Sequence, residues 1–472
     1  MPELLLALDA GTTGARAMLV DPAGAVLGID KRPIASRYPG PGLVEQDAST
    51  VWDICRAVIA GALAAGRRTI ADVAAIGVTT QRASVVLWNR ATGDPVAPML
   101  VWSDLRGMDE YKKLRAAGFS GWPQVPSAKL PAAIALSGRQ PADLQWGTLD
   151  SWLTFKLSGA HVTDASAAWM TGYYDYMQGV GWDSALLGHQ HLSPDLFPAQ
   201  VESWGAIAES NPAVLGGRVP ITALIADQQA AMVAHGALGR GAWKATYGTS
   251  GVLMAGTGEA PESIHGSMPA EALVFVGGKP RFCIEGMVIT TGSMIEWLCD
   301  GLGLFASPAA LEIAAASVAD AGNVFVRPSL AGMGAPHGQF EARGLIGGLS
   351  FADGPQQIAR AALQSIAFRF REIAEVIADA LPVPDALPVA GGLSTSDTLM
   401  QLQANALQRP VRRHAVREAS AYGAALAAGM GVGLFAEDDL KRLARYDAEF
   451  LPQVSRDEAD TTFAHWRDAV AV

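Results

Sequence analysis

Cysteine is scarce in this chain. The 472 residues include Cys55, Cys283 and Cys299, which are widely separated and follow no metal-ligand spacing. A small, odd number of cysteines argues against a disulfide framework and fits a reducing compartment. We therefore expect each cysteine to be a small buried apolar side chain.

The chain also lacks the signals that send a protein to or across a membrane. Its first residues, MPELLLALDAGTTG, carry no basic segment, and Asp9 interrupts the apolar run, so they do not form a signal peptide. We find no apolar stretch that approaches the roughly 18 residues needed for a membrane span. The expectation is a cytoplasmic protein without a membrane partner.

Positive charge is in deficit, because 35 Lys and Arg stand against 46 Asp and Glu and the net charge is -11. An acidic surface repels a phosphate backbone, so nucleic acid is not expected as a partner. A small anionic ligand would need local backbone donors or a metal ion instead. The chain is long and 50% hydrophobic, which predicts two or three globular domains with substantial cores.

Strand-like apolar runs and turns alternate at the start of the chain. Residues 4–8, 15–20 and 25–29 are strand-like, and the turn sequences AGTTG and DPAG separate them. This order predicts an antiparallel meander. The same order recurs about half a chain length later, where TYGTSG at residues 246–251 lies between two apolar runs. The repeat predicts two similar lobes, each opening with its own Gly/Thr loop.

Helical and strand-like patterns alternate after both loops. Helices are expected at residues 49–65, 355–380 and 396–407, and a strand at residues 74–79. Mixed elements in this order predict α/β layers. We place the division between the two lobes at residues 237/238, which gives lobes of residues 1–237 and 238–472.

The two Gly/Thr loops are candidate anion sites. Backbone N–H groups and hydroxyls in such a hairpin can face a phosphate, and an Asp at the end of the preceding strand can hold Mg²⁺ through water. A plain surface turn explains DAGTT alone equally well. Neither loop is a GxxxxGK[ST] P-loop, and the chain contains no such motif, which excludes a Walker-type site. Two such loops on two lobes predict a nucleotide held by both.

Asp227 follows an apolar strand at residues 220–225 and precedes a helical sequence at residues 228–237. It can be a helix N-cap, which is a common role for Asp. It can also be a carboxylate that accepts a hydroxyl proton in phosphoryl transfer, although spacing alone favours the cap. Gly391 and Gly392 present a similar choice between a strand-to-helix turn and a place where flat adenine approaches the backbone. Spacing alone does not establish the functional role in either case.

Ten segments, taken in order, resemble the FGGY family of carbohydrate kinases and its glycerol kinase-like members in particular. They span essentially the whole chain, and their order and spacing carry the resemblance more than any single segment does. The segments are LDAGTTGARAMLVDPAG, LVEQDAS, GVTTQRASVVLWNRATGDPV, VWSDLR, GTLDSWLTFKLSG, VTDASAAWM, ADQQAAMVAHGAL, TYGTSG, GMGAPHGQFEARGLIGGLS and VAGGLSTSDTLMQLQANALQRPV.

The resemblance implies a fold of two actin-like (ribonuclease H-like) lobes with an interlobe cleft that closes on substrate. It implies phosphorylation of a hydroxyl of a small sugar or polyol, with Mg²⁺ and ATP as the phosphate donor. Family members are often dimers or tetramers, which leaves a homodimer and a homotetramer open here.

The resemblance also assigns roles to residues. Asp227 falls on the catalytic base, and Asp9 lies near Mg²⁺. The positions on the nucleotide side are Thr12, Thr13, Arg16, Gly248, Thr249, Gly292, Gly392 and Ser396. The positions at the acceptor site are Arg82, Ala83, Trp102 and Gln228.

The acceptor half departs from the glycerol kinase pattern. Glycerol kinases carry a Glu after the QR of TTQR, where this chain has Ala83. An aromatic residue past the second loop is Val252 here, a Tyr near residues 124–127 is replaced, and the Asn after the GG pair is Ser396 or Asp397. A site without that carboxylate would discriminate poorly for glycerol. We therefore expect an acceptor other than glycerol, such as a larger polyol or a ketose.

Two alternatives use the same scaffold. One is a non-catalytic sugar or nucleotide sensor, which would need an output module that the sequence does not reveal. The other is an actin-like ATPase, which would not need the set Arg82, Trp102 and Gln228. Retention of Asp227 favours the kinase.

Overall fold

The structure is a computed structural model that describes residues 2–119, 121–175, 181–263 and 267–471. Its residues form two compact units, each built from several stretches of the chain. The first unit contains the residues up to Gly236, Glu271–Arg281 and Ser420–Leu443, and the second contains Ala237–Ala270, Phe282–Ala419 and the residues from Ala444 onward. The chain first passes from one unit to the other at Gly236/Ala237, and two later stretches return to the first unit.

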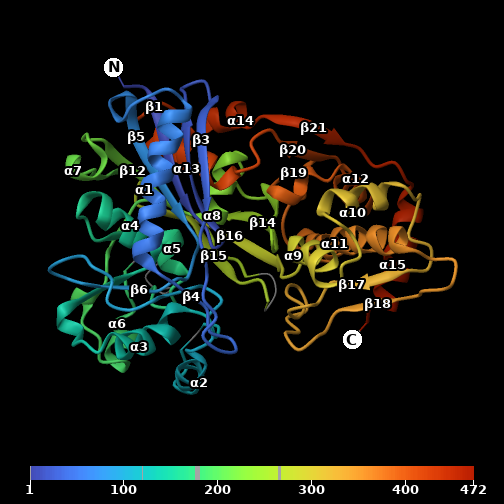
Figure 1. Cartoon of the computed structure of the whole chain (residues 1–472), viewed down its shortest axis with the longest axis horizontal. Helices are drawn as coiled ribbons and strands as arrows, with labels where there is room; N and C mark the ends of the chain where they lie inside the picture. The colour runs from blue at the N-terminus through green and yellow to red at the C-terminus, as the bar shows by residue number, and fades with distance from the viewer. Residues whose placement is uncertain (1, 120, 176–180, 264–266, 472) are drawn as a thin grey trace. The chain divides into compact units, whose positions relative to one another are not determined.

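The first unit is built on one mixed sheet (Figure 1). Its strands, in spatial order, are β11 (Trp204–Glu209), β12 (Pro220–Ala226), β5 (Val73–Thr80), β1 (Leu4–Ala10), β2 (Gly14–Val20) and β3 (Val26–Pro33). Strands β1, β2 and β3 form the antiparallel meander predicted from the sequence. Strand β5 is parallel to β1, β12 is parallel to β5, and β11 is antiparallel to β12.

The second unit repeats this arrangement. Among the described residues, its seven-stranded sheet begins with the edge strand β15 (Ala270–Val276) and continues with β16 (Lys279–Val288), β14 (Gly251–Gly258), β13 (Trp243–Tyr247), β19 (Leu387–Ala390), β20 (Val411–His414) and β21 (Tyr446–Phe450). The three strands from β16 to β13 pair antiparallel, β19 and β20 add in parallel, and β21 closes the edge antiparallel. The same succession of pairings in both units confirms the predicted repeat.

Helices cover the first sheet. Helix α1 (Ala48–Ala65) packs on β2 and β3, and Asp47 caps it by accepting from Ser49 N. Helix α13 (Ala419–Gly431) approaches strand β5 so closely that a Cβ on Gly77 would lie 2.1 Å from the carbonyl oxygen of Ala424. Glycine is therefore required at this position for the helix to lie against the strand.

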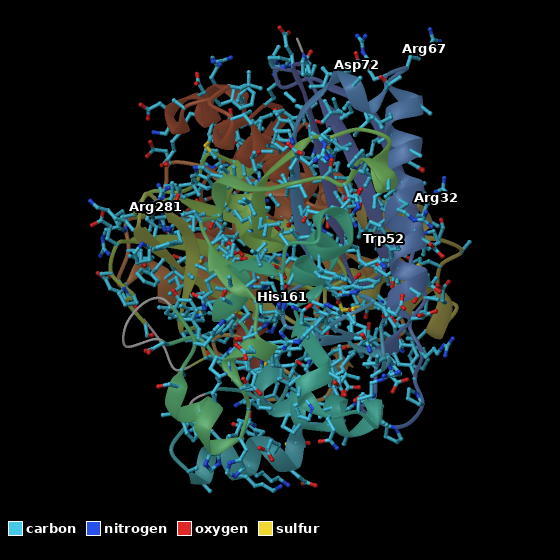
Figure 2. The ribbon with its side chains drawn as sticks, turned by 90° about the vertical axis from the view of Figure 1, so that its left-hand side faces the viewer. Arg32, Trp52, Arg67, Asp72, His161 and Arg281 are labelled. Carbon is cyan, nitrogen blue, oxygen red and sulfur yellow. The ribbon has the colours of Figure 1, made fainter. Side chains whose placement is uncertain are left out.

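Helix α1 meets the length and composition of a membrane span, contrary to the expectation that no apolar stretch would. It has 18 residues with a mean hydropathy of 1.3. Its apolar residues, however, belong to the first core: Val51, Cys55, Val58, Ile59 and Ala62 are buried there. Trp52, on the same helix (Figure 2), lies 5.8 Å and 5.9 Å from the cations of Arg56 and Lys156. The burial of these five residues in the first core explains the apolar composition as that of a core helix.

A second, smaller core of the first unit lies among the pair β6 (Val86–Asn89) with β8 (Leu144–Gly147), the pair β4 (Glu45–Gln46) with β7 (Met99–Leu100), and the helices α2 (Met108–Ala116) and α3 (Pro126–Ser137). Helix α4 (Leu149–Ser158) instead packs into the core of the first sheet, and α5 (Ala165–Trp169) contacts β12. Residues 124–127, where the family Tyr is replaced, lead into α3. Two predicted acceptor-site positions lie beside this smaller core in the chain: Ala83 between β5 and β6, and Trp102 shortly after β7.

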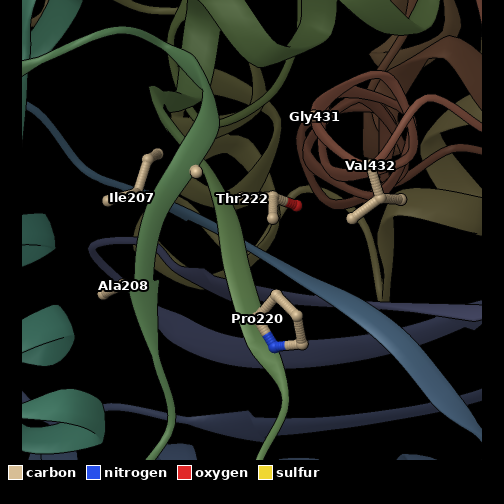
Figure 3. A pocket seen from close by; sticks show the side chains of 7 residues that line it. Ile207, Ala208, Pro220, Thr222, Gly431 and Val432 are labelled. Atoms are coloured by element: carbon tan, nitrogen blue, oxygen red, sulfur yellow. The ribbon is translucent and has the colours of Figure 1, made fainter.

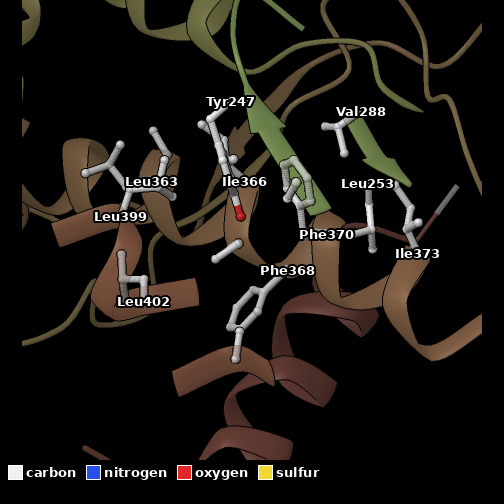
Figure 4. Close-up of a cluster of buried hydrophobic side chains, with 14 of the residues drawn as sticks. Tyr247, Leu253, Val288, Leu363, Ile366, Phe368, Phe370, Ile373, Leu399 and Leu402 are labelled. Carbon is white, nitrogen blue, oxygen red and sulfur yellow. The ribbon is translucent and has the colours of Figure 1, made fainter. Parts of the chain in front are cut away.

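The core of the second unit lies around α11 (Pro355–Ala378), which packs on α10 (Pro308–Ala316) and α12 (Asp397–Leu407). Figure 4 shows Tyr247, from the end of β13, among these helices. Its ring stacks on Phe370 with centroids 4.3 Å apart, and its hydroxyl donates to Gln403 at 2.7 Å. The strand that leads into the second Gly/Thr loop is thereby fixed to the core.

All three cysteines are buried and free, as expected. Burial raises the pKa of the Cys55 thiol, and the nearby negative charge of Asp9 adds to the increase. The thiol of Cys55 is therefore held in its neutral form.

Candidate functional site

Three adjacent parallel strands of the first unit end at the same level. Ala10 of β1 is paired with Thr80 of β5, and Thr80 is paired with Ala226 of β12. The residues that follow these strands are the first Gly/Thr loop, Gln81 with Arg82, and Asp227. Loops at the carboxyl ends of parallel strands are the usual ligand sites of α/β sheets. Strand register therefore brings the predicted phosphate loop, acceptor residue and base to one edge.

The first loop, between β1 and β2, is tight. Gly11 N donates to Gly14 O at 3.0 Å, and Thr13 O accepts from Ile34 N at 3.0 Å. The hydroxyl of Thr12 donates to Gln81 Oε1 at 3.1 Å and accepts from the indole nitrogen of Trp102 at 3.0 Å. Thr13 is exposed. The two threonines therefore differ, since Thr12 faces protein and Thr13 faces solvent.

Asp9 and Arg16 lie opposite each other in the β1–β2 pair. Arg16 Nη1 is 3.3 Å from Asp9 Oδ2, and Asp9 is 2% exposed. In the described part of the chain, no group of three or more His, Cys, Asp or Glu side chains could hold a metal ion. Mg²⁺ is usually bound by one or two carboxylates together with substrate phosphates and water. A single carboxylate beside the loop fits that mode of binding.

Asp227 is the first residue of α8 (Asp227–Ala234), which is shorter than the helix predicted to residue 237. The N-cap interpretation is wrong, because Ala226 occupies the cap and makes no side-chain cap bond. Asp227 Oδ1 accepts from Gln228 N at 2.8 Å and lies 3.6 Å from Arg82 Nε. The half-buried side chain of Gln228 shares this first turn. A carboxylate in the first helical turn is favoured by the helix dipole, and so is its ionised form.

A second carboxyl group lies beside Arg82. Arg82 Nη1 donates to Glu271 Oε2 at 2.9 Å, and the side chains of Arg82 and Glu271 are each 10% exposed. Glu271 belongs to β15 (Ala270–Val276), a stretch that the first unit includes. Glu271 was not predicted from the sequence, because no motif surrounds it and it lies far from Arg82 in the chain.

A buried lysine supports the acceptor side. Lys129 Nζ on α3 donates to the carbonyl oxygens of Ala83 and Val101, both at 2.8 Å, and to that of Trp102 at 3.4 Å. Ala83 has a φ of 54°, an unusual conformation for a residue with a side chain, and is buried. Burial lowers the pKa of Lys129 to about 7. Lys129 was also missed, although a lone lysine in an apolar helical sequence is a signal that could have indicated it.

A buried hydroxyl network lies behind Asp227. Ser166 accepts from Ala226 N at 2.9 Å and donates to Asp164 at 2.8 Å. Ser203 donates to Asp164 at 2.9 Å and accepts from Phe275 N at 3.0 Å. Burial raises the pKa of Asp164 to about 6. One carboxyl group thus connects the end of β12, which precedes Asp227, with the strand that bears Glu271.

The second Gly/Thr loop, within the second unit, is also tight. Gly248 N donates to Ser250 O at 3.1 Å, two residues on, whereas Gly11 N of the first loop donates three residues on, to Gly14 O. Gly292, at the start of α9 (Gly292–Glu296), donates its N–H to Gly248 O at 3.0 Å, and a Cβ there would lie 2.6 Å from that oxygen. Thr249 is exposed, as Thr13 is in the first loop. The structure therefore brings Gly248, Thr249 and Gly292 together.

Gly391 and Gly392 differ in what they contact. Gly391 has a φ of 94°, and a Cβ there would lie 2.4 Å from Tyr247 O. A Cβ on Gly392 would meet nothing within 4 Å. Ser396 is the N-cap of α12, accepts from Leu399 N at 3.0 Å and donates to Glu312. Gly391 has a structural role and Ser396 a capping role, whereas Gly392 is open to a ligand.

A cavity of about 390 Å³ lies elsewhere in the first unit, beside β11 and the amino end of β12 (Figure 3). Its lining is mainly apolar and includes Ile207, Pro220 and Val432. The hydroxyl of Thr222, which also lines it, donates to Ala428 O at 2.9 Å. The predicted site residues lie at the opposite, carboxyl end of β12, so this cavity is not the candidate site.

Comparisons with known proteins show which family this chain resembles. Residues 4–121 and 136–234 match the profile of the FGGY family of carbohydrate kinases, N-terminal domain, and residues 225–432 match that of its C-terminal domain. A glycerol kinase of Gloeobacter violaceus is 40% identical over 451 residues, which cover 92% of this chain and 89% of that protein.

Two solved structures share the fold over nearly the whole chain. The glycerol kinase of Plasmodium falciparum, solved with ADP, gives a TM-score of 0.89 at 22% identity and covers 99% of this chain and 98% of its own. A ligand-bound xylulose kinase of Lactobacillus acidophilus gives 0.86 at 21% identity with the same coverage. These likenesses confirm the prediction of two actin-like, ribonuclease H-like units.

Proposed function

We propose that this chain, which belongs to the FGGY family of carbohydrate kinases, transfers a phosphoryl group from ATP to a hydroxyl of a small sugar or polyol. Members of this family are ATP-dependent phosphotransferases. The observation that carries the proposal is the pair Asp227 and Arg82 at the carboxyl ends of β12 and β5, one strand away from the Gly/Thr loop that follows β1.

Asp227 is the proposed catalytic base. Its carboxylate accepts the proton of the attacking hydroxyl as the oxygen of that hydroxyl bonds to the γ-phosphorus and the bond to ADP breaks. The guanidinium of Arg82, 3.6 Å away, and the amino end of α8 both favour the ionised carboxylate that this role requires.

The nucleotide side is proposed to use both loops. Backbone N–H groups of these loops, with Thr13 and Thr249, would face the phosphates, and Gly392 would lie under the adenosine. Arg16 would add positive charge close to the first loop. Mg²⁺, when bound, would neutralise phosphate charge, and Asp9 is the residue proposed to hold it through water. Ser396 caps α12 a few residues after Gly392, so its proposed role is to hold the backbone near Gly392 in place.

The acceptor side is proposed to use Arg82, Trp102, Gln228 and the backbone at Ala83. A guanidinium and an amide suit hydroxyl groups, and an indole face suits the carbon chain of a polyol. Ala83 leaves space where glycerol kinases have a Glu. The proposed acceptor is therefore a polyol or ketose larger than glycerol, and the proposed compartment is the cytoplasm. A homodimer or homotetramer remains the prediction for its assembly.

A coupled assay for ADP release tests this function. Purified protein is given ATP and Mg²⁺, alone and with glycerol, four- and five-carbon polyols and pentuloses. The proposal expects ADP release that depends on an acceptor and a matching phosphorylated product. Equal ADP release without any acceptor would identify an ATPase, and nucleotide binding without any release would identify a sensor; either result would overturn the kinase.

A further inference from the structure

One guanidinium bridges two carboxylates in the first unit. Arg82 lies 2.9 Å from Glu271 through Nη1 and 3.6 Å from Asp227 through Nε. The side chain of Asp227 is 26% exposed, whereas those of Arg82 and Glu271 are each 10% exposed. Glu271 therefore shares its positive partner with the proposed base and lies within the proposed acceptor site, not on the open surface.

The position of Glu271 is built into the unit. Its strand β15 pairs with β16 and is also hydrogen-bonded, at Ala272 and at Phe275, to other parts of the first unit. Gln229 of α8 donates to Ala272 O at 3.2 Å, and Ser203 exchanges two hydrogen bonds with the backbone of Phe275 at 2.9 Å and 3.0 Å. Because Gln229 follows Asp227 and Gln228 on α8, the same helix fixes the base and the strand of Glu271.

The charges of this group bear on the acceptor. Two carboxylates and one guanidinium sum to one negative charge. At short range such a group disfavours an acceptor that itself carries a carboxylate. A carboxylate can accept about four hydrogen bonds, so a carboxylate that binds an arginine can also accept from a hydroxyl.

We propose that Glu271 is a specificity-determining residue of the acceptor site. It supplies, from β15, the carboxylate that Ala83 does not supply from the TTQR segment, and it selects an uncharged polyol or ketose over a sugar acid. This inference rests on the proposed function, because it names the acceptor class of the same site.

The test compares Glu271→Gln with the wild-type protein. Gln keeps the shape of the side chain and removes its charge. Steady-state assays measure KM and kcat for uncharged polyols and ketoses and for aldonic acids of four to six carbons. We expect the KM of the best uncharged acceptor to rise about tenfold to a hundredfold, as for loss of a charge-assisted bond, with a smaller change in kcat. We expect the kcat/KM ratio of uncharged to anionic acceptors to fall by at least about tenfold.

The ratio is the decisive measurement, because it does not depend on how much of a variant is folded. Glu209→Gln is the matched control, since Glu209 also pairs with an arginine, Arg218 at 2.7 Å, but on the exposed surface of β11. It should leave the ratio unchanged. Adding Ala83→Glu to Glu271→Gln should restore part of the preference for uncharged acceptors.

Isothermal titration calorimetry of acceptors, with a non-hydrolysable ATP analogue present, separates the inference about Glu271 from the proposed kinase function. An unchanged ratio in Glu271→Gln, or a wild-type preference for sugar acids, would overturn the inference and leave the kinase function intact. The wild-type protein could instead bind a polyol without phosphorylating it, and Glu271→Gln could weaken that binding. This result would support the inference and overturn the proposed kinase function. Wild-type protein that neither binds nor phosphorylates any polyol or ketose would overturn both.

Discussion

The indole nitrogen of Trp102 donates a 3.0 Å hydrogen bond to the hydroxyl of Thr12. This bond joins a proposed acceptor residue to the proposed phosphate loop within one unit. The same hydroxyl gives its single proton to Gln81. Thr12 therefore has no second proton for a phosphate, whereas the exposed hydroxyl of Thr13 does. The resemblance placed both threonines at the phosphates, and the geometry separates their roles.

Replacing each threonine by valine, which has nearly the same shape, should separate those roles. Thr12→Val removes the acceptor of the Trp102 bond and should raise the KM of the sugar or polyol about threefold to tenfold, as expected for one neutral hydrogen bond. Thr13→Val should mainly raise the KM of ATP. Steady-state kinetics with each substrate varied in turn provide both values. An increase in ATP KM alone for Thr12→Val would contradict the separation.

Asp227→Asn should remove the base and keep the shape of the site. We expect kcat to fall by about 10²–10⁴-fold, the range attributed to general-base catalysis. ATP affinity measured by calorimetry should stay within about threefold of the wild-type value, because Asp227 lies at the acceptor and not at the phosphate loop. Near-normal turnover in Asp227→Asn would exclude Asp227 as the base.

Much of this site could be predicted because it follows strand ends. Apolar runs in the sequence predict strands, and Gly and Thr predict loops. Strands β1, β5 and β12 end where the apolar runs end. Strand register then places Asp9, Thr12, Arg82 and Asp227 along one edge without further information. The meander and its repetition were predicted for the same reason, since period and turn chemistry are local properties.

The unpredicted residues act through contacts between distant segments. Glu271 meets Arg82 across 189 positions of the chain, and Lys129 meets Ala83 across 46. Such contacts depend on tertiary packing, which local patterns do not encode. The N-cap interpretation of Asp227 failed for a related reason. The strand continues to Ala226, so the helix begins at Asp227 itself and the cap falls one residue earlier.

Ala83→Glu should move the preference of the enzyme towards glycerol. Glycerol kinases have a Glu at this place, and the positive φ of 54° at Ala83 already accommodates a residue with a Cβ. We expect kcat/KM for glycerol to rise at least about fivefold relative to that for the best larger polyol, because a carboxylate can accept from the hydroxyls of a small acceptor. Competition between glycerol and the larger polyol in one reaction measures the ratio directly. A wild-type enzyme that already favours glycerol over every larger polyol would contradict the premise.

Two neighbouring glycines offer a matched pair for the nucleotide side. Gly391→Ala should lower stability by about 2 kcal/mol or more, because its φ of 94° and the Tyr247 oxygen 2.4 Å from the new Cβ both oppose a side chain. A Cβ added at Gly392 would meet nothing within 4 Å, so the melting temperature of Gly392→Ala should be unchanged. Its KM for ATP should nevertheless rise, if adenosine packs there as proposed. Differential scanning fluorimetry and ATP-dependent kinetics on both variants test this, and an unchanged ATP KM in Gly392→Ala would remove Gly392 from the site.

We expect the buried Lys129 to make the free energy of unfolding depend on pH, and its lowered pKa gives the sign of that dependence. Burial lowers its pKa from 10.5 to about 7, so between these pH values the folded protein has lost a proton that the unfolded chain still holds. In this pH range unfolding therefore takes up a proton. The contribution of Lys129 to the free energy of unfolding is smallest below pH 7 and rises as the pH increases above about 7. Lys129→Met has no such proton and provides the reference.

The difference in melting temperature between wild type and Lys129→Met should therefore be nearly constant from pH 5.5 to 6.5. From pH 7.5 to 9.0 it should shift in favour of the wild type by an amount equivalent to roughly 2 kcal/mol, at about 1.4 kcal/mol per pH unit. Lys156→Met, which removes a lysine of the same unit that lies over Trp52, is the control and should show no such change. A difference that shrinks as pH rises, or that shows no dependence on pH, would mean that Lys129 keeps its proton while it holds the carbonyl groups of Ala83, Val101 and Trp102.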